Sequence, residues 1–209
     1  MNEKIRLSHS TLNLLHTASH MWINKQMKLE QPDQVWFKEG REAHRIIQDH
    51  VSGSKRHDYL KDILVTFPIV ERCDFDPRCK FTFSWNEKYE LTGFVDGADW
   101  KNSRILEIKT SGKGAWSLQK YKDSVQRKLY GMALKVNEAY LITGSRKVED
   151  WKTQPPKVYS LKFTPQDIEE VKVWVQEGIH ILESGNFTGG LDENGRCTGC
   201  YWRENCHFT

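Results

Sequence analysis

Two short segments decide the fold of this chain, Gly93-Phe94-Val95-Asp96 and Leu106-Glu107-Ile108-Lys109-Thr110-Ser111. The first lies in a run from 89 to 100 in which apolar and polar residues mix at the spacing of a strand. The polar stretch 101–104 predicts a hairpin turn, after which the second segment returns as the next strand. The sequence therefore predicts a β-hairpin with charged residues on both arms.

The register of this hairpin decides which charges meet. With turn residues 101–102, Asp96 lies directly opposite Glu107, and with turn residues 102–103 it faces Lys109 instead. In both registers the three charged side chains share one face, because side chains alternate along a strand. Two opposed carboxylates repel each other unless a cation lies between them. A divalent metal with oxygen ligands, helped by Lys109, is the natural candidate.

The composition describes one folded domain. A chain of 209 residues can bury a full hydrophobic core, so we expect a single domain over residues 1–209. Hydrophobic residues make up 38% and charged residues 28%, which is typical of a soluble globular protein and excludes a disordered one. No apolar run approaches the ~20 residues that span a bilayer. The N-terminus leads into no apolar signal core, so neither membrane association nor secretion is expected.

Helix and strand patterns extend on both sides of the hairpin. The predicted helices are one capped by Ser8 or Ser10 that runs to about 28, and others near 35–51, 117–134 and after Thr164. The predicted strands lie near 63–70, 81–85, 89–100, 105–108, 139–143 and 158–163. This order predicts an α/β fold with a central mixed β-sheet flanked by helices.

Four short motifs lie on and around the hairpin: Gly40 to His44 (G-x-x-x-H), Gly93 to Asp96 (G-x-x-D), Glu107 to Ser111 (E-I-K-T-S) and Gln126 to Tyr130 (Q-x-x-x-Y). Together they resemble the active-site motifs of the PD-(D/E)XK nuclease superfamily in its RecB-like branch. The E-x-K triplet alone would fit a surface hairpin with a cross-strand ion pair equally well. Four motifs in this order are much more specific, and they imply a restriction-endonuclease-like core.

The resemblance implies roles for the hairpin residues. Asp96, Glu107 and the backbone carbonyl of Ile108 would hold Mg²⁺ or Mn²⁺, which polarises a phosphate and acidifies a water molecule. Lys109 would orient or deprotonate that water and stabilise developing negative charge. His44 would be a further metal ligand in the catalytic centre. Taken alone, His44 is better explained as a hydrogen-bonded helix histidine, and only the set of four motifs favours the ligand role.

Three further residues are expected to contact the substrate. Gln126 and Tyr130, one helical turn apart, resemble the substrate-contacting pair of the family, with Tyr130 able to stack on a base or bond a phosphate. Ordinary helix surface and core is the alternative for both. Lys113 follows the Glu-Ile-Lys strand on a glycine-flanked loop, so we expect it to contact a phosphate.

The C-terminal region carries Cys197, Cys200 and Cys206, three of the five cysteines. Without a signal segment, such thiols favour metal binding over disulfides. The spacing resembles the three-cysteine motif of iron–sulfur nucleases in the RecB-like branch, which include helicase–nuclease subunits and CRISPR-associated exonucleases. This resemblance implies a [4Fe–4S] cluster that joins residues 1–30 to residues 185–209.

The fourth ligand of this cluster departs from the family pattern. Ala18 occupies the position where the resemblance places a cysteine, so the ligand is open and His20 is the first candidate. The other candidates near in sequence or on a loop are His16, His207, Cys73 and Cys79. Three thiolates and an imidazole also suit zinc, so a structural Zn²⁺ site is the alternative to the iron–sulfur cluster.

These features predict a metal-dependent DNA nuclease, with exonuclease action favoured, in recombination, repair or phage DNA processing. The substrate would be single- or double-stranded DNA with free ends, in the cytoplasm of a bacterial or phage-infected cell. No Gly-x4-Gly-Lys-Ser motif is present, so strand separation would need a helicase or recombination partner. A non-catalytic DNA-binding module on the same fold and a restriction-type endonuclease are the alternatives.

Overall fold

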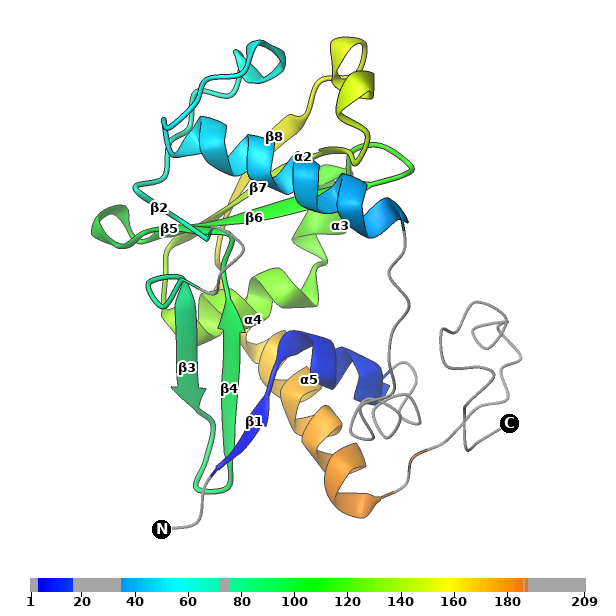
Figure 1. Ribbon diagram of the computed structural model, residues 1–209. Helices are drawn as coiled ribbons and strands as arrows, with labels where there is room; N and C mark the ends of the chain where they lie inside the picture. Colours follow the sequence, from blue (N-terminus) through cyan, green and yellow to red (C-terminus); the bar gives the residue numbers. More distant parts are fainter. Residues whose placement is uncertain (1–3, 17–34, 72–75, 186, 188–209) are drawn as a thin grey trace.

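The computed structural model of the chain describes residues 4–16, 35–71, 76–185 and 187 (Figure 1). The strands form two sheets. A three-stranded sheet has the order β1 (Ile5–Leu7), β4 (Tyr89–Phe94) and β3 (Lys80–Ser84). A five-stranded sheet has the order β2 (Ile69–Val70), β5 (Gly97–Asp99), β6 (Arg104–Ser111), β7 (Glu138–Ser145) and β8 (Lys157–Lys162). Both sheets are mixed, because β1 runs parallel to β4 and β6 runs parallel to β7 while the other pairs are antiparallel.

Helices cover both faces of the five-stranded sheet. On one face α2 (Val35–Val51) buries Ala43 and Ile47 against Leu106 and Ile108 of β6. On the other face lie α3 (Leu118–Lys122) and α4 (Val125–Leu134), whose Leu129 belongs to the second core cluster. The helix α5 (Pro165–Ser184) and the helical residues 9–16 extend this second core toward the three-stranded sheet (Figure 1). The charged strand β6 therefore runs between two apolar layers.

Local signals place several helix ends where the sequence predicts them. The Ser8 hydroxyl accepts a hydrogen bond from the Thr11 amide at 3.1 Å, so Ser8 caps the first helix. Thr164 and Asp167 form a reciprocal capping box at the start of α5, with Pro165 in the first turn. The α/β fold with mixed sheets flanked by helices is confirmed.

The predicted sheet and three predicted elements differ from the structure. The strands divide between two sheets rather than forming one central sheet, and the predicted strand 89–100 is divided into β4 and β5, which belong to different sheets. The predicted strand 63–70 is reduced to Ile69–Val70, because Pro68 cannot donate to a sheet ladder. The predicted helix 117–134 is broken into α3 and α4, since the Ser124 hydroxyl accepts from the Arg127 amide and starts a new helix.

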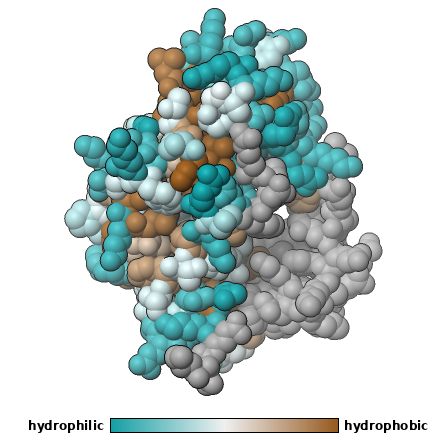
Figure 2. Space-filling model, turned by 60° about the vertical axis from the view of Figure 1, so that its left-hand side comes forward, coloured by the Kyte–Doolittle hydropathy of each residue, from teal (hydrophilic) through white to brown (hydrophobic). Residues whose placement is uncertain are grey.

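Polar side chains cover much of the described surface on the face seen in Figure 2, with apolar side chains gathered between them. Within the described ranges, no helix is long and apolar enough to cross a membrane.

Candidate active site

A bend between two sheets positions the first acidic residue. The chain leaves β4 of the small sheet at Phe94 and enters β5 of the large sheet at Gly97, with only Val95 and Asp96 between them. The Val95 amide donates to the Cys79 carbonyl at 3.0 Å, and the Asp96 carbonyl accepts from the Glu71 amide at 3.0 Å. Asp96 is therefore held where the two sheets diverge.

The hairpin of β5 and β6 has the first of the two predicted registers. Gly97 pairs with Leu106 and Asp99 with Arg104, which sets Asp96 opposite Glu107 when the pattern is continued by one residue. A turn of 3-10 helix over 100–102 connects the strands, and the Asp99 carboxylate accepts from the Asn102 amide at 3.2 Å. The turn centred on 101–102 is thus confirmed.

Glycines are required on this segment because neighbouring atoms approach its backbone closely. A Cβ atom on Gly93 would lie 2.8 Å from the ring of Phe81, and one on Gly97 would lie 3.1 Å from the carbonyl oxygen of Ile69. The glycine of the G-x-x-D motif therefore makes room for an aromatic ring that packs beside the site.

The three charged residues of the hairpin interact through one ion pair and one hydrogen bond to the backbone between them. The Asp96 Oδ2 atom accepts a hydrogen bond from the Ile108 amide at 2.6 Å. The Lys109 Nζ atom lies 2.9 Å from Oε2 of Glu107, whose side chain is 3% exposed. Lys109 thus neutralises part of the negative charge that the opposed carboxylates bring together.

Burial sets the protonation of this centre. It raises the pKa of Glu107 to about 7 and the pKa of Asp96 to about 6, although the positive charge of Lys109 opposes both shifts. Burial alone would lower the pKa of Lys109, but the charges of Glu107 and Asp96 outweigh it and raise that pKa. The centre favours an added cation, and Lys109 is an ammonium group near neutral pH.

Gln126 lies inside this charged centre. Its Oε1 atom accepts from Lys109 Nζ at 2.8 Å, and its Nε2 atom donates to the Tyr130 hydroxyl at 2.9 Å and to Glu107 Oε1 at 3.3 Å. Tyr130 is only 5% exposed, and its ring packs edge-on against Phe81 with centroids 5.1 Å apart. The structure therefore buries the Tyr130 ring, which leaves it little surface for stacking on a base, and bonds the partly exposed Gln126 to three protein side chains.

The imidazole of His44 reaches the same centre from α2, on the opposite face of β6. Burial first, and then the charge of Lys109, lowers the pKa of His44 to about 4, while a hydrogen bond to the Ile108 backbone opposes that shift. His44 is therefore neutral near pH 7, which is the state in which an imidazole binds a metal.

Two residues near the centre are not predicted by the sequence. Glu71 follows β2 and lines a cavity with His44, and its charge raises the pKa of Asp96. His9 begins the first helix, and burial followed by the charge of Lys109 lowers its pKa to about 4. Neither has a sequence signal, because each reaches the site through the packing of an element distant from the hairpin.

The remaining predicted residues lie apart from this centre or outside the described residues. Lys113 is exposed in the turn after β6. Cys197, Cys200, Cys206 and His20 all lie outside the described residues.

Two of the other candidates for the fourth cluster ligand are described. Cys79 is 1% exposed in the core, and burial raises the pKa of its thiol to about 12. The His16 ring stacks on Trp174 with centroids 4.6 Å apart, and its Nε2 atom lies 2.7 Å from the Trp174 carbonyl oxygen. Among the described residues, Cys79 thus packs in the core and His16 against Trp174.

The donor set of the hairpin fits a hard divalent cation. Among the described residues, no group of three or more His, Cys, Asp and Glu side chains is gathered as a metal site. The two carboxylates do not converge because Asp96 accepts from the Ile108 amide and Glu107 pairs with Lys109. Two carboxylates and a backbone carbonyl are the oxygen ligands that Mg²⁺ or Mn²⁺ prefers, and the neutral imidazole of His44 adds a nitrogen donor.

Comparisons with known proteins agree with this arrangement. A family model described as the PD-(D/E)XK nuclease superfamily matches residues 11–207. The crystal structure of SSO0001 is 14% identical, and the alignment covers 99% of this chain and 88% of that one with a TM-score of 0.57. A candidate exonuclease from Eubacterium rectale is 12% identical, with 96% and 88% of the two chains covered and a TM-score of 0.53. At these identities the structures show a shared fold. The search of curated proteins found no match.

Proposed function

Because the chain belongs to the PD-(D/E)XK nuclease superfamily, we propose that it is a metal-dependent deoxyribonuclease with exonuclease action. The observation that carries the proposal is the placement of Asp96, just before β5, opposite Glu107 on the paired strand β6, with the Lys109 Nζ atom 2.9 Å from Glu107. The order of the four motifs supports the RecB-like branch, whose members act on DNA ends. The whole of residues 1–209 would form a single nuclease domain.

Asp96, Glu107, the Ile108 carbonyl and His44 would hold Mg²⁺ or Mn²⁺. When bound, the metal supplies a Lewis acid for the phosphate and lowers the pKa of a water molecule. Lys109 is protonated at neutral pH because its pKa is raised, so it acts by orienting the water and by stabilising negative charge on the phosphate oxygens. A raised pKa argues against Lys109 as the base that removes the proton.

Gln126 would act mainly by holding Lys109 against Glu107, and Tyr130 by holding Gln126. This assignment gives both residues a positioning role in place of direct substrate contact, and it is supported by their hydrogen bonds and by the burial of Tyr130. Lys113, exposed just after β6, remains a proposed phosphate contact.

The cysteines Cys197, Cys200 and Cys206 would hold a [4Fe–4S] cluster, with His20 as the proposed fourth ligand and structural Zn²⁺ as the alternative. Residues 1–30 and 185–209 would then be joined by the metal. Replacement of any of the three cysteines by serine should destabilise the protein more than it changes the chemistry. Iron and zinc analysis of the purified protein, with its visible absorption spectrum, decides between cluster and zinc.

The substrate would be DNA in the cytoplasm of a bacterial or phage-infected cell, during recombination, repair or phage DNA processing. A helicase or recombination partner would supply strand separation.

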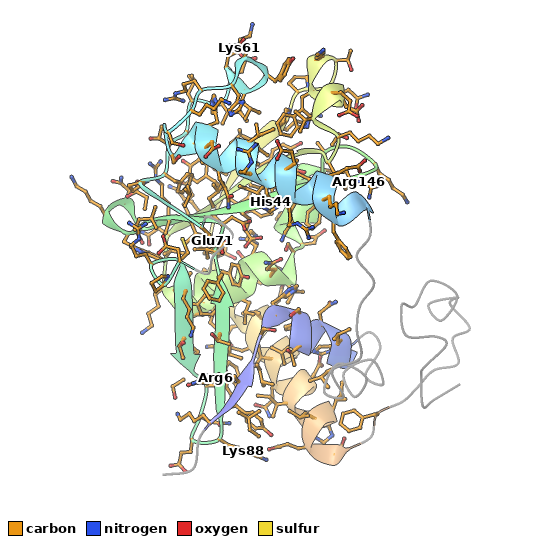
Figure 3. The ribbon with its side chains drawn as sticks, in the orientation of Figure 1. Arg6, His44, Lys61, Glu71, Lys88 and Arg146 are labelled. Carbon is orange, nitrogen blue, oxygen red and sulfur yellow. The ribbon has the colours of Figure 1, made fainter. Side chains whose placement is uncertain are left out.

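End-labelled linear DNA and closed circular DNA, incubated with Mg²⁺ or Mn²⁺, test this function. We expect wild type to degrade linear DNA and Lys109→Ala to lose that activity. Lys61→Ala removes an exposed lysine far from His44 and serves as the matched control (Figure 3). Cleavage of circles would indicate endonuclease action instead. If wild type binds DNA but leaves both substrates intact, the chain is a binding module on a nuclease fold.

A further inference from the structure

A cavity of about 550 Å³ opens beside the charged centre, between α2 and the ends of β6 and β7. The lining residues that matter for its chemistry are Phe37, Arg41, His44, Glu71, Thr110 and Arg146. His44 lines the cavity, and the positive charge of Lys109 lowers the pKa of His44. The cavity therefore adjoins the catalytic centre. The labelled residues His44 on α2, Glu71 just after β2 and Arg146 just after β7 come from three separate parts of the chain (Figure 3).

The cavity lies where two parallel strands end together. Ser111 pairs with Ser145, so β6 and β7 reach the same sheet edge, and Arg146 follows directly. The Arg146 amide donates to the Ser111 carbonyl at 3.1 Å. Ligands of α/β proteins commonly bind outside the carboxyl ends of parallel strands, where loop residues converge.

Arg146 is held in place before any ligand arrives. Its Nε atom lies 3.0 Å from Oε2 of Glu39 on α2. Its guanidinium packs over Gly112, where an added Cβ would lie 3.1 Å from Cζ of Arg146. The side chain still lines the cavity and is 32% exposed. A guanidinium that is oriented beforehand loses less conformational freedom when it binds an anion.

We propose that this cavity binds a nucleotide of the substrate strand next to the cleaved phosphodiester, with Arg146 as the contact to its phosphate. The proposal rests on the nuclease function proposed above. The planar donor fork of arginine matches phosphate oxygens, and Arg41 and the Thr110 hydroxyl add donors on the same wall. Phe37 adds an aromatic side chain to the lining of the same cavity.

Glu71 fixes the direction of the bound nucleotide in the cavity. Its amide donates to the Asp96 carbonyl, and its charge contributes to the raised pKa of Asp96, so Glu71 lines the part of the cavity close to Asp96. The acidic residue on that side and Arg146 on the other give the cavity a polarity that favours a phosphate near Arg146. Arg146 is thus a positioning residue for the strand rather than a catalytic one.

The test measures binding of a fluorescent single-stranded oligonucleotide by anisotropy, with Ca²⁺ in place of Mg²⁺ and with the intact length checked on a gel. Arg146→Ala should weaken binding about tenfold to a hundredfold, as expected for loss of a hydrogen bond to a charged group. Loss of one phosphate contact should also reduce the slope of log K against log salt by about 0.7. Arg6→Ala removes an exposed arginine at the far end of the molecule and should change neither quantity (Figure 3).

Arg146→Lys provides a second variant in case the alanine variant unfolds, because it keeps the positive charge. It should bind with intermediate affinity, and thermal unfolding should match wild type. The inference is overturned if the affinity of either folded Arg146 variant equals that of Arg6→Ala. If wild type cleaves DNA in that case, only the inference fails; if wild type neither binds nor cleaves, the proposed function fails with it. If Arg146→Ala binds more weakly but wild type does not cleave DNA, the result supports nucleotide binding in the cavity and refutes the proposed nuclease activity.

Discussion

The substitution Gln126→Leu separates two roles for the glutamine of the Q-x-x-x-Y motif. Its sequence position predicts contact with the substrate, whereas its hydrogen bonds tie it to Lys109, Glu107 and Tyr130. Leucine has a similar volume and cannot accept from Lys109 Nζ. If Gln126 positions the ammonium group, the loss should appear in the chemical step and not in substrate binding.

The magnitude follows from the bond at 2.8 Å between Gln126 and Lys109. A hydrogen bond to a charged group is worth about 1.5–3 kcal/mol. At about 1.4 kcal/mol for each factor of ten, kcat should fall roughly 10- to 150-fold if the bond is fully expressed in the transition state. The Tyr130 hydroxyl also loses its donor, so the free energy of unfolding should fall by about 1 kcal/mol.

The assay is steady-state cleavage of a quenched fluorescent oligonucleotide, with kcat and KM determined separately. Gln166→Leu is the matched control, because Gln166 is exposed and bonds only to Glu170 in the described contacts. Positioning is refuted if Gln126→Leu raises KM and leaves kcat within twofold of the control. That result would restore direct substrate contact as the role of Gln126.

Other predictions concern stability. Gly93→Ala should lower the free energy of unfolding by about 1–3 kcal/mol, because the added methyl overlaps the Phe81 ring; the urea midpoint should fall with an unchanged m-value. Asp167→Ala should cost about 3 kcal/mol in thermal or urea unfolding, since it leaves the buried Arg127 guanidinium without its carboxylate partner. Burial would raise the pKa of Asp167, but hydrogen bonds from Arg127 and Thr164 lower it overall. The stability that Asp167 contributes is therefore present above its unfolded pKa of about 3.9 and is lost as the pH falls through its lower folded pKa. The urea midpoints of wild type and Asp167→Ala should therefore converge below about pH 4. A constant difference between the two proteins down to pH 2 would contradict this assignment.

Features encoded within a few residues could be predicted from the sequence. The side-chain alternation of β6 follows from strand geometry, whereas the turn sequence leaves two hairpin registers open, and the structure selects the one that sets Asp96 opposite Glu107. The start of α5 follows from Thr164, Pro165 and Asp167, which are adjacent in the chain. These features depend on local backbone geometry, so they do not change with the elements that pack against them.

Features that depend on packing between distant elements could not be predicted. The surroundings of Gln126 and Tyr130 depend on how α4 lies against β6 and β3, which places the Tyr130 ring on Phe81. Arg146 gains its position from Glu39 on another element, and Glu71 from a backbone bond to Asp96. No periodicity or spacing in one segment carries that information.

The short sequence separation between Asp96 and Lys109 has a consequence for how the protein folds. These residues belong to one hairpin with a tight turn, so bringing them together costs little loop-closure entropy. Gln126 and Arg146 belong to later segments, and β7 must cross over from β6 before Arg146 can reach its place. During synthesis on the ribosome, a nascent chain that ends after β6 would hold all three charged groups yet lack the helix that aligns Lys109. The proposed catalytic residues are therefore present early in synthesis, whereas the proposed active site is completed only when α4 and the residues after β7 have been added.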